Sequence, residues 1–232
     1  MRDAFIAWLT QITQPVWTSL VSVEDFIQAL EQTIYMVVVA FFFGAVWGFL
    51  QAITLVLTRD EGILPNKPIY QILNPIVNAL RSLPFVILMI AMIPITKFIT
   101  GKTIGTAAAI VPLVVYIGPY MGRLIETSLL EVNEGIIESA QAMGATPLQI
   151  IFKFILPEAR SSLILNLTTA NISLIGATAM AGVVGGGGIG DLAYAYGYQR
   201  FDTFIMILTI IVLLILVQIA QTFGQWLSKL RW

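Results

Sequence analysis

The sequence contains no cysteine and no histidine among its 232 residues. The lack of cysteine excludes disulfides, thiolate metal sites and thiol nucleophiles, and the lack of histidine removes the commonest general base and metal ligand. Charged residues make up only 11% of the chain, whereas soluble domains usually carry about a quarter. The formal net charge of −1 gives no long-range field of either sign, which argues against nucleic-acid binding.

What the sequence does contain is long apolar runs, with 58% hydrophobic residues overall. A helix needs roughly 20 apolar residues to cross a bilayer core about 30 Å thick. Backbone polar groups inside lipid must be paired within their own segment, so such runs are helices. Five stretches meet this length and predict an all-α integral membrane protein: Thr33–Leu57, Ile72–Ile95, Ile104–Ile125, Ser162–Val184 and Phe204–Phe223.

Prolines interrupt two of these stretches. Pro75, Pro84 and Pro94 lie in the second, and Pro112 and Pro119 lie in the third. Prolines at these positions favour bent helices around a cavity, although membrane helices also tolerate proline without such a role.

Lysine and arginine are unevenly distributed between the two ends of the stretches, and they concentrate on the cytoplasmic side of membrane proteins. If the N-terminus lies outside and the C-terminus lies in the cytoplasm, most lysines and arginines fall on the cytoplasmic side, as this rule requires. The inner side then holds Arg59, Lys67, Arg81, Arg123, Lys153, Arg160, Lys229 and Arg231. Only Arg2, Lys97, Lys102 and Arg200 fall outside. Arg123 and Glu126 are one turn apart and predict a structural ion pair, with a coupling role as the alternative.

The predicted organisation has three parts. Residues 1–30 form an extracytoplasmic extension, in which Phe5, Trp8, Leu9 and Ile12 share one helical face; this is typical of an interfacial helix, with a disordered tail as the alternative. Residues 31–228 form the transmembrane domain, and residues 229–232 form a cytoplasmic tail.

A cytoplasmic loop at residues 131–161 breaks the apolar pattern. A helix over Glu134–Met143 is predicted to stop at Gly144, a residue suited to the left-handed position after a helix. Thr146, Pro147 and Gln149 then form the N-cap, first position and capping box of a second short helix. Pro157 is predicted to begin the next membrane helix. On helix signals alone, the loop is either a rigid knob for a groove on a soluble partner or a connector lying on the surface.

The residues of this loop resemble the "EAA" loop of the membrane subunits of bacterial ATP-binding-cassette importers. The matching positions are Glu138, Ala140, Gly144, Leu156 and Pro157, whereas Ser139 and Phe154 depart mildly from the pattern. The resemblance implies the type I permease fold with five transmembrane helices, and it implies that this loop is a coupling helix that docks on a separate ATPase. The implied coupling residues are Glu138, Ser139, Ala140, Met143, Gly144, Ala145, Thr146, Pro147, Leu156 and Pro157.

Further segments are similar to methionine-importer permeases. These are Gly-Ala-Thr-Pro at 144–147, Ala-Ile-Val-Pro-Leu at 109–113 and Tyr-x-Tyr-Gly-Tyr at 194–198. Arg-Ser-Leu-Pro at 81–84 resembles amino-acid importers more generally. The resemblance implies a homodimer in the cell membrane with an ATPase subunit and an external solute-binding protein as partners.

The fourth and fifth stretches differ in polarity. The fifth is almost purely aliphatic, which suits lipid, whereas the fourth carries small and hydroxylated residues. Such residues either line a wet path or pack helices closely. The first alternative makes Asn171, Ser173 and Thr178 pathway residues, and the resemblance implies that Met180 helps to close the pathway.

Several sequence features argue against other functions. No ionisable residue lies near the middle of a stretch, which argues against a proton- or sodium-coupled carrier. Gly185, Gly187 and Gly190 spell a dinucleotide motif, but they follow a membrane helix rather than a strand; a flexible turn is predicted instead. The tyrosines at 194, 196 and 198 are predicted to form an interfacial belt, with contact to the binding protein as the alternative.

No Walker A motif is present, so we expect no enzyme activity and no cofactor in this chain, with ATP and Mg²⁺ bound by the partner. The expected function is the permease subunit of an importer for an amino acid, and the resemblance implies that this amino acid is methionine. The alternatives are the same machine for another amino acid, a scaffold or receptor subunit without transport, and a passive channel.

Overall fold

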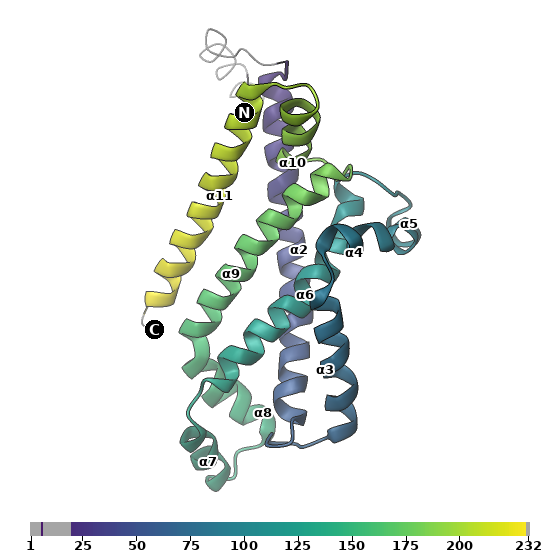
Figure 1. Ribbon diagram of the computed structural model, residues 1–232. Helices are drawn as coiled ribbons and strands as arrows, with labels where there is room; N and C mark the ends of the chain where they lie inside the picture. Colours follow the sequence, from purple (N-terminus) through teal and green to yellow (C-terminus); the bar gives the residue numbers. More distant parts are fainter. Residues whose placement is uncertain (1–5, 7–19, 231–232) are drawn as a thin grey trace. The chain divides into compact units, whose positions relative to one another are not determined.

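The computed structural model describes residue 6 and residues 20–230, and this part of the chain is helical without strands (Figure 1). Four helices are long and apolar enough to cross a membrane, or five when α3 and α4 count as one broken span. The elements in chain order are α2 (Val23–Thr58), α3 (Lys67–Ser82), α4 (Phe85–Ala91), α5 (Ile93–Thr100), α6 (Thr106–Leu130), α7 (Glu134–Ala142), α8 (Pro147–Gln149), η1 (Ile150–Ile155), α9 (Leu156–Val183), α10 (Ile189–Leu192), η2 (Ala193–Tyr198) and α11 (Thr203–Lys229).

The chain folds into two compact units, each built from three separate segments. Unit 1 contains residues up to 39, residues 85–113 and residues 174–218. Unit 2 contains residues 40–84, 114–173 and those from 219 onward. The long helices α2, α6, α9 and α11 each contribute residues to both units.

Unit 1 has an apolar core formed by the start of α2 and the residues just before it, by α10 and by the start of α11. Its buried residues are Val21, Phe26, Ala29, Ile189, Leu192 and Ile205. Helix α2 is capped by Ser22, whose hydroxyl oxygen accepts a hydrogen bond from the amide of Asp25 (3.1 Å). The capped first turn, with Glu24 and Asp25, precedes the apolar run, so the helix begins at Val23 rather than near Thr33.

The glycine run in unit 1 forms the predicted turn, and this turn is tightly packed. Gly185, Gly187 and Gly188 have positive φ angles of 86°, 78° and 80°, a region that other residues enter at a cost. A Cβ atom on Gly190 would lie 2.1 Å from the carbonyl oxygen of Ala179. Two side chains of α2 hold the run in place. Gln32 accepts a hydrogen bond from the Gly188 amide, and Thr33 accepts one from the Ile189 amide, both at 2.8 Å.

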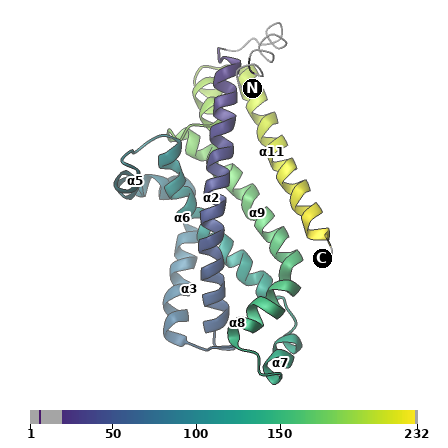
Figure 2. The same cartoon turned by 180° about the vertical axis from the view of Figure 1, so that it is seen from behind.

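In unit 2, α3 runs beside the second half of α2 in both ribbon views (Figures 1 and 2). Helices α2 and α6 approach closely at glycines, since a Cβ atom on Gly48 would lie 2.7 Å from the amide nitrogen of Gly122. Small residues permit such contacts between membrane helices. The side chain of Gln51 adds a hydrogen bond to the carbonyl of Pro119 (3.4 Å).

The second predicted span is broken rather than continuous. Helix α3 ends at Ser82, and Leu83 is extended with φ −76° and ψ 129°. A residue before proline is disfavoured in the helical region, so Pro84 forces this break. Pro75 is accommodated inside α3, and Pro94 lies in the first turn of α5, where a proline leaves no additional amide unpaired.

The fourth span also differs from its prediction. The helix does not restart at Pro157 but runs from Pro147 to Val183. Residues Ile150–Ile155 form a π-helical turn directly before Leu156. A proline ring collides with the carbonyl four residues earlier in an α-helix, and the wider π turn relieves this contact. Apart from residue 6, the predicted interfacial helix near Phe5–Ile12 lies outside the described residues.

Candidate functional site

The connection between α6 and α9, residues 131–161, is a capped helical hairpin; we call residues 133–155 of it the coupling hairpin. Asn133 caps α7 by accepting a hydrogen bond from the Gly135 amide (2.8 Å). At the other end of α7, the amides of Gly144 and Ala145 donate to the carbonyls of Gln141 and Ala140 (2.9 and 3.1 Å). This paired arrangement, with Gly144 at φ 77°, is a Schellman motif. The predicted stop at Gly144 is confirmed.

The second arm of the hairpin begins with the predicted capping box. The amide of Gln149 donates to Thr146 Oγ1 (3.4 Å), and the amide of Thr146 donates to Gln149 Oε1 (2.9 Å). Pro147 occupies the first turn of the helix. The helix ends at the hairpin tip are therefore paired locally.

The base of the hairpin is tied to the membrane helices by hydrogen bonds from α9 to the end of α6 and to Glu131 directly after it. Ser162 Oγ donates to Glu131 Oε2 (2.5 Å), and Asn166 Nδ2 donates to Ser128 Oγ (2.7 Å). Ala140, Ile151 and Ile155 are buried beneath the hairpin. The base of the hairpin is therefore held against the membrane helices by hydrogen bonds and by buried side chains.

The tip of the hairpin exposes apolar side chains. Met143 is 68% exposed and Leu148 is 59% exposed. Four apolar residues of the second arm have different surroundings: Ile151 and Ile155 are buried, whereas Leu148 and Phe152 are exposed. The ring of Phe152 lies 6.3 Å from the ring of Phe49, centroid to centroid. A rigid, partly apolar tip suits docking into a groove better than free solvation.

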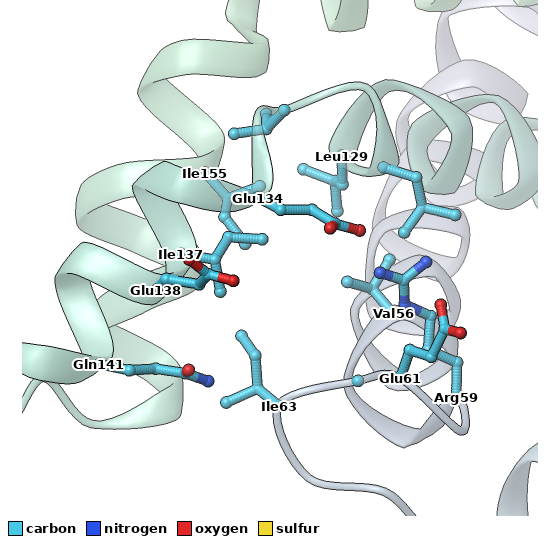
Figure 3. A pocket seen from close by; sticks show the side chains of 13 residues that line it. Val56, Arg59, Glu61, Ile63, Leu129, Glu134, Ile137, Glu138, Gln141 and Ile155 are labelled. Carbon is cyan, nitrogen blue, oxygen red and sulfur yellow. The ribbon is translucent and has the colours of Figure 1, made fainter.

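A cleft of about 430 Å³ separates α7 from the end of α2 and the loop that follows it. Figure 3 shows Glu134, Glu138 and Gln141 of α7 on one side, opposite Arg59 and Glu61. Three carboxylates against one guanidinium make this cleft acidic. The sequence predicted a role for Glu138, but it gave no signal that Arg59 and Glu61 would lie near it.

The remaining predicted coupling residues lie along the hairpin and at its junction with α9. The Ser139 hydroxyl donates to the Gly135 carbonyl (2.6 Å), and Pro147 lies in the first turn of α8. Leu156 is half-buried and Pro157 is exposed where η1 passes into α9. Ala145 is half-buried beneath the tip.

A polar cluster lies between α3 and α6 in unit 2. Arg123 forms the predicted ion pair with Glu126 (2.9 Å), and its second terminal nitrogen donates to Asn74 Oδ1 (2.5 Å) and Asn78 Oδ1 (2.8 Å). The guanidinium of Arg81 lies 5.9 Å from the ring centroid of Tyr120. The asparagines were missed, although their spacing of four residues places both on one face of α3.

The four predicted pathway residues on α9 have different surroundings. Met180 is 51% exposed, whereas Thr178 is buried and its hydroxyl donates to the Ile175 carbonyl (2.7 Å). Ser173 Oγ lies 3.2 Å from the hydroxyl of Tyr116. Asn171 is half-buried, and its Oδ1 is buried without a partner. Met180 is therefore the most accessible of the four within this chain.

Comparison with known proteins decides the family. Residues 44–230 match the family of binding-protein-dependent transport system inner membrane components. The chain belongs to this family. It is a membrane permease component of an ATP-binding-cassette importer, with the type I fold, and the ATPase of such a system is a separate subunit.

Individual relatives agree with this assignment. A probable D-methionine transport system permease protein of Vibrio cholerae is 47% identical, with 92% of this chain and 94% of that protein covered. A methionine import system permease protein of Bacillus subtilis is 40% identical, with 76% and 79% covered. A chain from inward-facing structures of the MetNI methionine ABC transporter is 41% identical with a TM-score of 0.86, with 88% of this chain and 95% of that chain covered.

Proposed function

We propose that this chain is the permease subunit of a methionine importer driven by ATP hydrolysis in a partner subunit. The observation that carries the proposal is the coupling hairpin, which is rigid, fused to two membrane helices and apolar at its tip. The named substrate of the relatives from Vibrio cholerae and Bacillus subtilis supports methionine as the solute.

In the proposed assembly, two copies of the chain enclose the pathway, and each coupling hairpin docks on one ATPase subunit that binds ATP and Mg²⁺. An extracytoplasmic solute-binding protein delivers methionine to the outer face. The N-terminus lies outside and the C-terminus lies in the cytoplasm, in accord with the distribution of lysine and arginine.

The hairpin geometry supports a direct coupling mechanism. When two ATPase subunits close on ATP, the tips around Met143 and Leu148 follow them. The bonds of Ser162 and Asn166 then transmit this displacement to α6 and α9, because they join both helices at the hairpin base. Helix α9 carries the proposed gate residue Met180 and the proposed pathway residues Asn171, Ser173 and Thr178.

Uptake of labelled methionine into vesicles containing the permease, its ATPase and its binding protein tests the proposal. We expect uptake that requires ATP. This uptake should be lost in Leu148→Asp, because a carboxylate at the apolar tip opposes docking on the ATPase. Leu64→Asp is the control, because Leu64 is similarly exposed (52%) but lies outside the hairpin. ATP-independent uptake would indicate a passive channel, and ATPase binding without uptake would indicate a scaffold.

The orientation has its own test because the sequence contains no cysteine. Met143→Cys introduces a single thiol at the hairpin tip. We expect a membrane-impermeant maleimide to label it in inside-out vesicles and not in intact cells. Labelling from the outside would contradict the cytoplasmic placement of the hairpin.

A further inference from the structure

Helix α3 carries an apolar stripe that the rest of the described chain leaves exposed. Ile69, Ile72 and Ile76 are 44%, 66% and 50% exposed, and Ala79 is exposed as well. At about 100° per residue, the four side chains lie within an arc of about 80°. Their spacing matches the a and d positions of a seam between two helices. We call these four residues the α3 stripe.

The α3 stripe is separate from the side of α3 that packs on its own bundle. On that side, Val77 is only 2% exposed. Arg123 of α6 donates hydrogen bonds to Asn74 Oδ1 (2.5 Å) and Asn78 Oδ1 (2.8 Å). With 3.6 residues per turn, the α3 stripe lies on the other side of the helix from these contacts. It is a second apolar surface and not part of the core of this chain.

The contacts of Arg123 also show where α3 lies along α2. Residues 32–58 of α2 include no charged residue, and Gly48 lies about 15 Å before the end of this stretch, at 1.5 Å per residue. Gly48 meets Gly122 of α6, because a Cβ atom on Gly48 would lie 2.7 Å from the Gly122 amide nitrogen. Arg123 follows Gly122 directly. The middle of α3 therefore lies beside the apolar part of α2 and not beyond its end.

A polar face borders the α3 stripe near this depth. Gln71, Asn78 and Ser82 are exposed. Amide groups exposed to lipid tails are costly, so a polar face among apolar helices favours water. Helix α11 is different, because every exposed residue between 205 and 217, including Ile210 and Leu214, is apolar. The exposed side of α11 suits lipid, whereas the exposed side of α3 combines a narrow apolar stripe with a wet face.

Water at this depth belongs to a pathway, and in the proposed assembly two copies of the chain enclose the pathway. We propose that the α3 stripe packs against the α3 stripe of a second copy, and that Gln71 and Asn78 line the pathway beside this contact. A two-fold axis along the membrane normal brings identical surfaces together and keeps the two α3 helices parallel. The small side chain of Ala79 lets the two backbones approach closely, which favours helix contacts in membranes. This inference rests on the proposed function.

Cysteine cross-linking tests the contact, because the unsubstituted permease contains no cysteine. Ile72→Cys and Ile76→Cys each give one thiol per copy. A short bis-methanethiosulfonate is added to membranes with the full complex, once without nucleotide and once with ATP and vanadate, since the two copies can move during the cycle. We expect the cross-linked permease dimer to become the main species for both variants in at least one of these conditions.

Ile210→Cys is the matched control, because Ile210 is 49% exposed, as Ile76 is 50% exposed, but lies on the apolar face of α11. We expect the uncross-linked permease to remain its main species in both conditions. Gln71→Cys tests the polar face, and a water-soluble charged thiol reagent should modify it faster than Ile210→Cys. Monomer as the main species for both stripe variants in both conditions, or equal cross-linking of Ile210→Cys, would overturn the proposed contact.

A second measurement decides between a second copy and lipid at the α3 stripe. A fluorophore attached to the single thiol of Ile76→Cys or Ile210→Cys is exposed to brominated phospholipid, which quenches on contact. We expect strong quenching at position 210 and weak quenching at position 76. Quenching at position 76 that equals or exceeds that at position 210 would overturn the proposal in favour of lipid. Normal methionine uptake beside a negative result rejects the α3 contact alone, whereas absent uptake by the unsubstituted complex rejects the proposed function with it.

Discussion

The two long connections in this chain are stabilised by opposite means. The α6–α9 connection is held by contacts between near neighbours, such as the capping box of Thr146 and Gln149. The α9–α11 connection is held by Gln32 and Thr33, which accept hydrogen bonds from amides that lie 156 residues further along the chain. Local capping produces a hairpin that keeps its shape when it projects away from the bundle. Long-range contacts produce a turn that depends on the packing of its whole unit.

This comparison predicts the most severe effect at Gly190. In Gly190→Val, the first added carbon would meet the Ala179 carbonyl at 2.1 Å, and backbone cannot move aside as a flexible side chain can. Overpacking of this kind costs about 3 kcal/mol or more. We expect little folded protein by fluorescence-detected size-exclusion chromatography in detergent. Gly176→Val is the matched control, because nothing lies within 4 Å of a Cβ atom there; equal yields of the two variants would contradict the packing account.

A smaller effect is expected at Thr33. In Thr33→Val, the buried amide of Ile189 loses its acceptor, at a cost of about 1–3 kcal/mol. Thermal unfolding of the purified permease should show the loss. Thr54→Val is the control, since the Thr54 hydroxyl bonds only within its own helix, to the Leu50 carbonyl (2.8 Å). If both variants unfold at the same temperature, α2 does not anchor the α9–α11 connection.

Gly144 tests the local side of the comparison. A Cβ atom there meets nothing within 4 Å, so the cost of Gly144→Val is backbone strain at φ 77°, about 1–2 kcal/mol. We expect weaker co-purification of the ATPase with a nearly unchanged melting temperature of the bundle. Gly144→Asn should retain more binding, because asparagine tolerates the left-handed region. Equal binding by the valine and asparagine variants would show that strain at this residue does not matter for docking.

The smallest effect is expected at Thr146. Thr146→Ala removes the N-cap of the second arm, at a cost of about 1 kcal/mol. Hydrogen exchange at Gln149 should accelerate, because its amide loses the Thr146 oxygen. Thr146→Ser, which keeps an equivalent oxygen, should restore slow exchange. Acceleration in both variants would indicate that the capping box does not hold the arm.

The sequence predicted the parts of this molecule that depend on neighbouring residues. The cap at Thr146, the stop at Gly144 and the apolar spans follow from local chemistry, and each is present in the structure. The start of α2 at Val23 was missed because the prediction counted apolar residues, and the first turn of this helix contains the charged residues Glu24 and Asp25.

Features that depend on distant residues were not predictable in the same way. The packing of Gly190 against Ala179 and the pairing of Arg123 with Asn74 require knowledge of which helices meet. The cleft beside Glu138 likewise needs Arg59, which lies far away in the chain. A single sequence specifies these contacts only through the complete fold.

Hydrogen–deuterium exchange of the permease with and without its ATPase tests the central claim most directly. The claim is that the hairpin around Met143 and Leu148 is preformed and is the surface on which the ATPase docks. We predict slow exchange at Ala145 and Gln149 in the permease alone, and further protection of residues 139–149 when the ATPase binds. Rapid exchange across the hairpin in the free permease, or protection confined to other segments in the complex, would contradict the account.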